Sequence, residues 1–173
     1  MDGRLVVSHD PLKCKPYLFF DEICKYIKNK NYEGYLAINV KEDNLENQLI
    51  CSLSDYGINN WFTFDHSIPD LITSKSLKSF YRISEYETYQ FYDFINVKGC
   101  WLDSFNSPHW YGNDLLEDLI SKADLAIVSS ELHGFSPKTQ WSIIKRILQN
   151  KSQHRLFLCT DLPEEASKFF EII

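Results

Sequence analysis

Residues 115–133, LLEDLISKADLAIVSSELH, show in one place the pattern that decides the fold. Leucine and isoleucine recur at positions 115, 116, 119 and 120, which is the spacing of one helix face. The apolar run 125–129 follows with the composition of a buried strand. Glu131 and His133 come directly after this run. We therefore predict a helix, a strand and a polar strand end in this order.

The same alternation recurs along the chain. Strands are predicted where short runs are apolar and rich in β-branched or aromatic residues, namely 4–8, 35–40, 61–64, 80–83, 99–102, 125–129 and 155–159. Helical spacing is found in 20–27, 45–53, 115–120, 141–148 and 166–170. Residues 85–94 are dense in aromatics and have a poor period. Strand followed by helix predicts a parallel sheet with helices outside it.

Two helix starts carry sequence signals. Asp43 and Glu46 are placed like a capping box, and Gly57 is placed to close the same helix. Ser136 is predicted as the N-cap of the helix at 141–148, with Pro137 as its first residue.

The parallel fold can be either an open doubly wound sheet or a closed barrel. A dinucleotide-binding sheet needs a glycine-rich turn after a strand to hold the pyrophosphate, and the sequence has none. We therefore predict a (β/α) barrel of the TIM type. No linker rich in Pro, Gly or Ser divides the chain, so residues 1–173 are predicted to form a single domain.

Composition narrows the class of partner. Of the 173 residues 44% are hydrophobic, which is enough for a core, and the net charge of −6 comes with no basic block. Nucleic-acid surfaces depend on clustered Lys and Arg, so a nucleic-acid partner is not expected. No apolar run is long enough for a membrane span and no export signal is visible, which predicts a cytoplasmic protein.

The cysteines and three of the histidines have no partner nearby in the sequence. The five cysteines, at 14, 24, 51, 100 and 159, form no C-x-x-C pair. This spacing fits neither a zinc site nor a disulfide framework, and we expect reduced thiols in the core. His66, His109 and His154 are expected in loops or on the surface.

Polar residues follow nearly every predicted strand. In a parallel α/β fold these positions lie at the carboxyl ends of the strands and converge on one rim, where barrels have their active sites. Catalysis is assigned to His9, Lys41, Glu131 and His133, and substrate binding to Arg82, Asp65, Glu85, Trp101 and Asp103. An N-cap role for Asp65 and Asp161, and a solvated position for Lys41 and Arg82, stay open as alternatives.

These side chains suit an anionic substrate. Lys41 and Arg82 are predicted to hold phosphate oxygens. A histidine that titrates near neutrality, His9 or His133, is predicted to protonate a leaving alkoxide. The carboxylates offer oxygen ligands for Mg²⁺ or Ca²⁺, so a divalent metal is an expected cofactor. The expected partner is therefore a small phosphorylated molecule.

Seven stretches, taken in order, resemble one enzyme family. They are DGRLVVSHDP (2–11), LAINVKED (36–43), WFTFDHSIPD (61–70), YRISEYE (81–87), GCWLDSF (99–105), IVSSELHG (127–134) and CTDLP (159–163). The family is that of the glycerophosphodiester phosphodiesterases, barrel enzymes related to phosphatidylinositol phospholipase C. The resemblance implies that His9 protonates the leaving alcohol and that Lys41 contacts the phosphate. Asn39 stands where the family has a metal-binding glutamate, which weakens a metal site because an amide is a poor replacement for a carboxylate.

The family's first two strands carry H-R-G and E-x-D motifs that this sequence lacks. The resemblance therefore implies a barrel whose first two βα units are absent, with open sheet edges that favour a homo-oligomer. We expect a hydrolase of glycerophosphodiester-type substrates, weak or inactive in this form. Two alternatives stay open: a non-catalytic anion-binding or assembly module, and a metal-independent enzyme that acts through Glu131 and His133.

Overall fold

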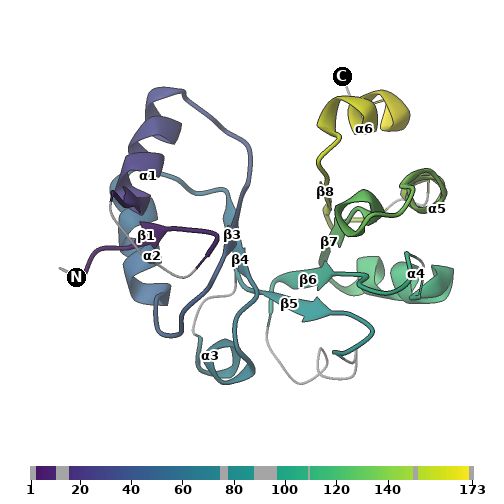
Figure 1. The fold of residues 1–173 in the computed structure, drawn as a ribbon, viewed down its shortest axis with the longest axis horizontal. Helices are drawn as coiled ribbons and strands as arrows, with labels where there is room; N and C mark the ends of the chain where they lie inside the picture. Colours follow the sequence, from purple (N-terminus) through teal and green to yellow (C-terminus); the bar gives the residue numbers. More distant parts are fainter. Residues whose placement is uncertain are drawn as a thin grey trace. The chain divides into compact units, whose positions relative to one another are not determined.

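A computed structural model describes residues 3–10, 16–74, 78–87, 97–108, 110–149 and 152–171. Internal contacts divide the chain into two compact units, 1–76 and 77–173. The predicted α/β class is confirmed, since parallel strands alternate with helices in both units (Figure 1). The single domain stays a prediction. None of the helices within the described ranges is long and apolar enough to cross a membrane.

The first unit has two short strand pairs and three helices among its described residues. Its elements are β1 (Val6–Val7), β2 (Leu18–Phe19), α1 (Phe20–Asn29), β3 (Leu36–Asn39), α2 (Glu46–Asp55), β4 (Trp61–Phe64) and α3 (Ile68–Thr73). β1 and β2 are antiparallel, whereas β3 and β4 are parallel, with Asn39 opposite Phe64. The carboxyl ends of β3 and β4 therefore lie side by side.

The core of the first unit forms where α1 and α2 pack on each other and on β3 and β4. α1 is amphipathic because its apolar residues recur every three or four positions. The buried cluster consists of Phe20, Cys24, Val40, Leu49, Leu53 and Trp61. Its members come from both helices, from β4 and from Val40 just after β3, and Leu36 and Ile38 of β3 pack against them, so their burial joins these elements.

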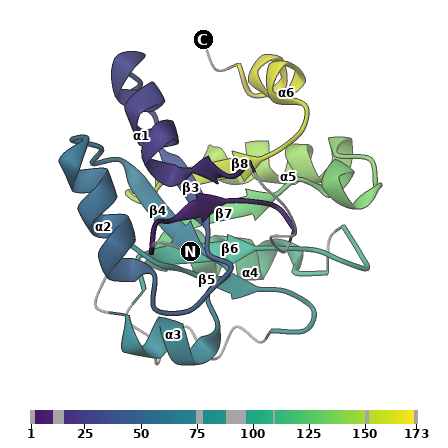
Figure 2. The same cartoon turned by 60° about the vertical axis from the view of Figure 1, so that its left-hand side comes forward.

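The second unit is built on one parallel sheet. Its elements are β5 (Phe80–Ile83), β6 (Gly99–Leu102), α4 (Gly112–Lys122), β7 (Asp124–Val128), the 3₁₀ turn η2 (Ser130–His133), α5 (Lys138–Leu148), β8 (Leu156–Cys159) and α6 (Pro163–Phe170). The sheet order is β5-β6-β7-β8, the same as the chain order. α4 packs against β7 and α5, and both helices lie on one face of the sheet (Figure 2).

β5, β6 and β7 are buried almost completely, whereas every residue of β8 is partly exposed. Every residue of β6 and β7 is buried, which is typical of parallel strands covered on both faces. The largest fully buried side chains of the unit include Phe80, Ile83, Leu102, Leu116, Leu119, Leu125, Ile127 and Ile144. The buried strands are near-continuous apolar runs, which is why they could be predicted from the sequence.

Gly99, the first residue of β6, lies where the sheet leaves no space for a side chain. A Cβ atom at this position would come within 2.4 Å of the carbonyl oxygen of Asp124 and 2.7 Å of the Phe80 ring. Both distances are far below van der Waals contact. The close approach of β6 to its neighbours therefore depends on glycine.

Some predicted ends differ from the structure. α2 begins at Glu46 after Leu45, so Asp43 does not cap it, and the Glu46 carboxylate accepts a hydrogen bond from Ser74 instead. α5 begins one residue after Pro137, and its first turn has no side-chain cap from Ser136. The predicted stretch 85–94 lies mostly outside the described residues.

Besides the 3₁₀ turn η2, two elements were not predicted. β2 has only two residues, and α3 has only six, too few for a visible period. The start of α3 nevertheless carries a signal, because the Ser67 hydroxyl accepts a hydrogen bond from the Asp70 amide as an N-cap. The first predicted strand also differs from expectation, since β1 pairs antiparallel with β2 rather than in a parallel sheet.

The described cysteines are free thiols that differ in how far they are buried. Cys24 and Cys100 are buried as predicted, and burial raises their pKa values to about 11 and about 12. Cys159 is half-buried, and Cys51 is exposed, so the prediction of a core thiol is wrong for Cys51. Cys14 lies outside the described residues.

We expect Leu102→Ala to lower the free energy of unfolding by about 2–5 kcal/mol, because it leaves a cavity at a fully buried position. Leu148→Ala is the same chemical change at a side chain that is 49% exposed, and it should cost about 0.5 kcal/mol or less. Urea denaturation followed by circular dichroism measures both values. Equal losses would contradict the placement of Leu102 in the core.

Candidate functional site

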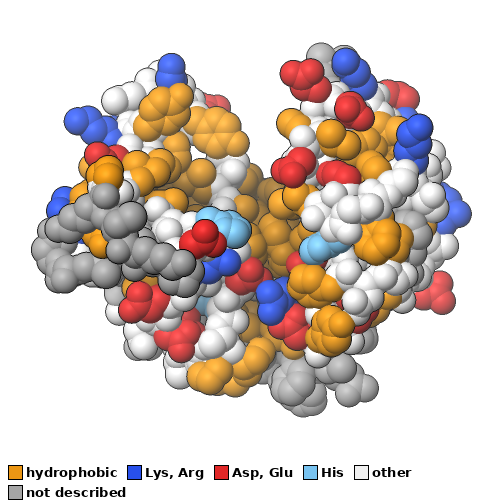
Figure 3. Space-filling view, viewed as in Figure 1, with side chains coloured by type: hydrophobic (Ala, Val, Ile, Leu, Met, Phe, Trp, Pro, Cys, Tyr) orange, Lys and Arg blue, Asp and Glu red, His pale blue; other side chains and the backbone are white. Residues whose placement is uncertain are grey.

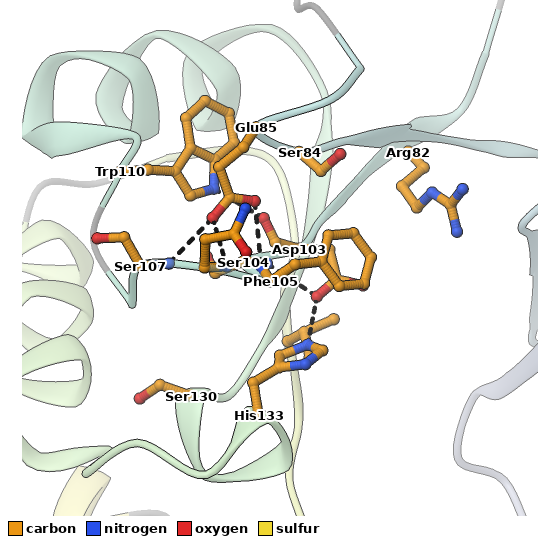
Figure 4. A network of polar contacts seen from close by, with 12 residues as sticks. Arg82, Ser84, Glu85, Asp103, Ser104, Phe105, Ser107, Trp110, Ser130 and His133 are labelled. Atoms are coloured by element: carbon orange, nitrogen blue, oxygen red, sulfur yellow. Dashed lines mark hydrogen bonds and ion pairs between the residues drawn. The ribbon is translucent and has the colours of Figure 1, made fainter.

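The carboxyl edge of the β5–β8 sheet collects polar residues. Ile83 pairs with Leu102, Leu102 with Ile127, and Ile127 with Leu158, so the four strands end close to one another. The residues that follow the strands become neighbours, although they are far apart in the sequence. Figure 4 shows the network that several of them form.

Asp103 and His133 form a close pair at this edge. The Oδ1 atom of Asp103 lies 2.8 Å from Nε2 of His133, and the same oxygen accepts the Ser104 amide at 2.8 Å. Asp103 is 8% exposed, whereas the His133 side chain is 24% exposed. The rings of Phe105 and His133 pack edge to face, with their centroids 5.2 Å apart. A buried carboxylate thus orients a partly exposed imidazole, which is the arrangement of an acid-base group.

Glu131, the other predicted catalytic residue of this turn, joins two strand ends. Its carboxylate accepts hydrogen bonds from the hydroxyls of Ser129 and Thr160 and from the Asp161 amide. The Ser129 hydroxyl in turn accepts the indole N–H of Trp141 at 2.8 Å. Glu131 therefore connects the end of β7 with the end of β8, and its catalytic role stays a prediction.

Arg82 is engaged by a carboxylate of its own segment. Its Nε and Nη2 atoms donate to the two oxygens of Glu87 at 2.7 and 2.9 Å. The Ser84 hydroxyl also donates to Glu87 at 2.9 Å. In Figure 4 Arg82 lies to one side of the Asp103–His133 pair. This bidentate ion pair places Arg82 at the edge of the sheet but already neutralises its charge.

Glu85 binds backbone rather than presenting an open carboxylate. Its two oxygens accept the amides of Phe105, Asn106 and Ser107 at 3.0, 3.0 and 3.2 Å. Burial raises the pKa of Glu85, but hydrogen bonds led by that of the Asn106 amide outweigh burial and hold the pKa below its ordinary value. Trp101, also predicted to bind substrate, lies within β6 and is 6% exposed.

The remaining predicted residues lie in the first unit. His9 and Asp10 contact each other at 3.0 Å with exposed side chains, and Lys41 is exposed after β3. Asp65 follows β4 with a φ of 64°, and its Oδ2 accepts the Asn39 side-chain amide at 2.9 Å. Thus the ends of β3 and β4 bring Asn39 and Asp65 together.

His66 lies in the loop between β4 and α3, which agrees with the predicted loop or surface position, but its side chain points inward. Its Nδ1 lies 2.7 Å from Asp70 and its Nε2 lies 2.8 Å from the Thr63 hydroxyl, with 3% of the side chain exposed. Burial raises the pKa of Asp70, but the Asn44 amide and His66 outweigh it and hold that pKa below its ordinary value. Asp70 follows His66 by four positions, but His66 precedes α3, so helical spacing did not predict the pair.

The amino edge of the second sheet has a different electrostatic arrangement. Asp124, 4% exposed at the start of β7, accepts the Arg155 amide at 3.0 Å. Two cationic side chains, Lys98 and Arg155, each lie 3.7 Å from its carboxylate, and the His154 ring lies 3.8 Å from it. His154 therefore has a partner that its sequence neighbourhood does not show. His109 lies outside the described residues.

Comparisons with protein-family models, with curated proteins and with solved structures found no match to this chain. Within the described residues, no group of three or more His, Cys, Asp and Glu side chains is placed to hold a metal ion. On the face seen in Figure 3, Lys and Arg side chains are scattered singly among acidic ones on each unit.

We expect Glu85→Gln to destabilise the chain most at neutral pH. Because the folded pKa of Glu85 is lowered, its stabilisation is complete above the ordinary carboxyl pKa of about 4.3 and is lost as the pH falls through the lower folded value. The difference between wild type and variant should therefore shrink towards acid in urea denaturation at pH 7, 4.5 and 3. Glu117→Gln, an exposed position on α4, is the control and should show no such pH-dependent difference. A constant difference would contradict the ionised hydrogen-bonding role.

Proposed function

We propose that the chain is a phosphodiesterase-like (β/α) barrel protein that hydrolyses a glycerophosphodiester-type substrate, with His133 as its acid-base group. The observation that carries this proposal is the Asp103–His133 pair, which joins a buried carboxylate to a partly exposed imidazole at the carboxyl edge of a parallel sheet. The order of the seven stretches that resemble the family supports the substrate class.

The strand order supports the barrel. Each strand from β5 to β8 adds beside the one before it, as consecutive strands do in a barrel. A doubly wound sheet instead reverses its direction at a switch point.

The proposed reaction needs one proton donor and one orienting carboxylate. Protonated His133 donates to the alkoxide oxygen as the bond between that oxygen and phosphorus breaks, while the oxygen of water forms the new bond to phosphorus and the proton that water loses passes to solvent, from which the imidazole is protonated again. Asp103 holds the imidazole in position and stabilises its cationic form. Lys41 and His9 enter this proposal only through the resemblance.

The donor set near Asn39 does not fit a divalent metal well. The Asn39 side-chain N–H donates to Asp65, which leaves a neutral carbonyl oxygen where the family has a carboxylate. We therefore derive no step through a metal. Binding of Mg²⁺ or Ca²⁺ stays a prediction.

We expect His133→Ala and Asp103→Asn to reduce kcat for bis(p-nitrophenyl) phosphate by about 10²- to 10⁴-fold, because each removes part of the acid-base pair. His154→Ala is the matched control, since this side chain is similarly exposed at 26% and also lies near an aspartate, but at the amino edge. Release of p-nitrophenol, measured with and without EDTA, reports the rate and any metal requirement.

The outcomes of this experiment distinguish the proposed mechanism from the two alternative functions. Full activity of His133→Ala would overturn the proposed mechanism. Binding of glycerol 3-phosphate without turnover of the phosphodiester would favour the non-catalytic anion-binding module. Turnover that survives EDTA and is lost in both Glu131→Gln and His133→Ala would favour the metal-independent enzyme.

A further inference from the structure

Glu85 connects two segments that are distant in the sequence. It lies in the turn after β5, and its carboxylate holds the amides of residues 105–107, which follow β6. Three amides in a row on one carboxylate form a concave donor site that fixes the backbone of the loop. The lowered pKa of Glu85 agrees with an ionised acceptor in this place.

Further contacts fix the same loop on both sides of these amides. The Asn106 side-chain amide donates to the Tyr86 hydroxyl, and the rings of Tyr86 and Phe105 lie 6.1 Å apart. The indole N–H of Trp110 donates to the carbonyl of Asp103 at 2.8 Å. The loop that begins at Asp103 is therefore held at its start and along its middle.

Phe105 connects this fixed loop to the candidate acid-base pair. Its amide donates a hydrogen bond to Glu85, and its ring packs edge to face on the His133 ring, with the ring centroids 5.2 Å apart. Asp103, two residues earlier, holds Nε2 of the same imidazole. The ring of His133 is thus placed by two residues of one loop, and Glu85 holds that loop (Figure 4).

We propose that Glu85 is a positioning residue: by binding the amides of residues 105–107 it holds Phe105 against His133 and so keeps the imidazole aligned with Asp103. The consequence for catalysis rests on the proposed function, whereas the consequence for the orientation of His133 does not. This role replaces direct substrate binding, because both Glu85 oxygens already accept hydrogen bonds and an anionic carboxylate would repel a phosphodiester.

The orientation of His133 can be measured in the full chain by nuclear magnetic resonance. In wild type the ring protons of His133 should be shifted by the ring current of Phe105, and their signals are assigned with His133→Ala and His154→Ala. We expect Glu85→Gln to move these signals towards their positions in Phe105→Leu, which lacks the ring. The amides of residues 105–107 should also exchange with solvent at least about tenfold faster. Signals of His154 should not move.

Two variants serve as references. Glu117→Gln removes the same charge from an exposed position of α4 and should leave the His133 signals unchanged. Glu85→Asp keeps the charge on a shorter side chain and should restore part of the wild-type shift. If Glu85→Gln does not fold, Glu85→Asp carries the test, with an intermediate shift expected and a wild-type shift with unchanged amide exchange contradicting the proposal.

Kinetics add a second readout. Misplacement of the imidazole should lower kcat by up to about 10²-fold with KM little changed, whereas loss of a substrate contact would raise KM. Unchanged His133 signals in a folded Glu85→Gln variant would overturn the positioning role. If wild type does not hydrolyse the phosphodiester, the proposed function fails, but the spectroscopic result still decides the role of Glu85.

Discussion

The second unit depends on the in-register parallel pairing of β5 to β8. In this ladder Leu102 lies opposite Ile127, so Asp103 lies beside the end of β7, and the 3₁₀ turn η2 that follows β7 brings His133 to it. A slip of one residue would turn every side chain of a strand to the opposite face. The register is specified by burial, because all residues of β6 and β7 are buried. Packing in the interior thus determines the geometry at the edge.

The two edges of this sheet use charge in different ways. At the amino edge, Asp124 is nearly inaccessible and faces the cationic side chains of Lys98 and Arg155, so its charge is compensated within the protein. At the carboxyl edge, Asp103 faces a single imidazole whose ring is partly open to solvent. The first edge therefore pairs its buried charge within the protein, whereas the second edge leaves the proposed acid-base group partly open to solvent. This difference follows the general division of labour between the two faces of parallel α/β folds.

Strand positions could be predicted from the sequence far better than side-chain partners. The runs at 61–64, 80–83 and 99–102 coincide with β4, β5 and β6, because buried parallel strands are short, continuous apolar segments. The start of α5 was displaced by one residue, since a cap depends on local hydrogen bonds that residue types do not determine. The contact between Glu85 and residues 105–107 spans about 20 positions and uses backbone amides, which carry no sequence signal. The roles of His9 and Lys41 stay predictions.

Gly99 has a consequence for any relatives of this chain. Since even a methyl group would meet the carbonyl oxygen of Asp124 at 2.4 Å, substitution there would push two neighbouring strands apart at their first residues. Amino-acid substitutions at residue 99 should therefore be very rare among homologues, whereas the exposed residues of α4 can vary. An alignment of homologues should then show an invariant glycine at this position, conserved because neighbouring strands approach closely there and not because it takes part in chemistry.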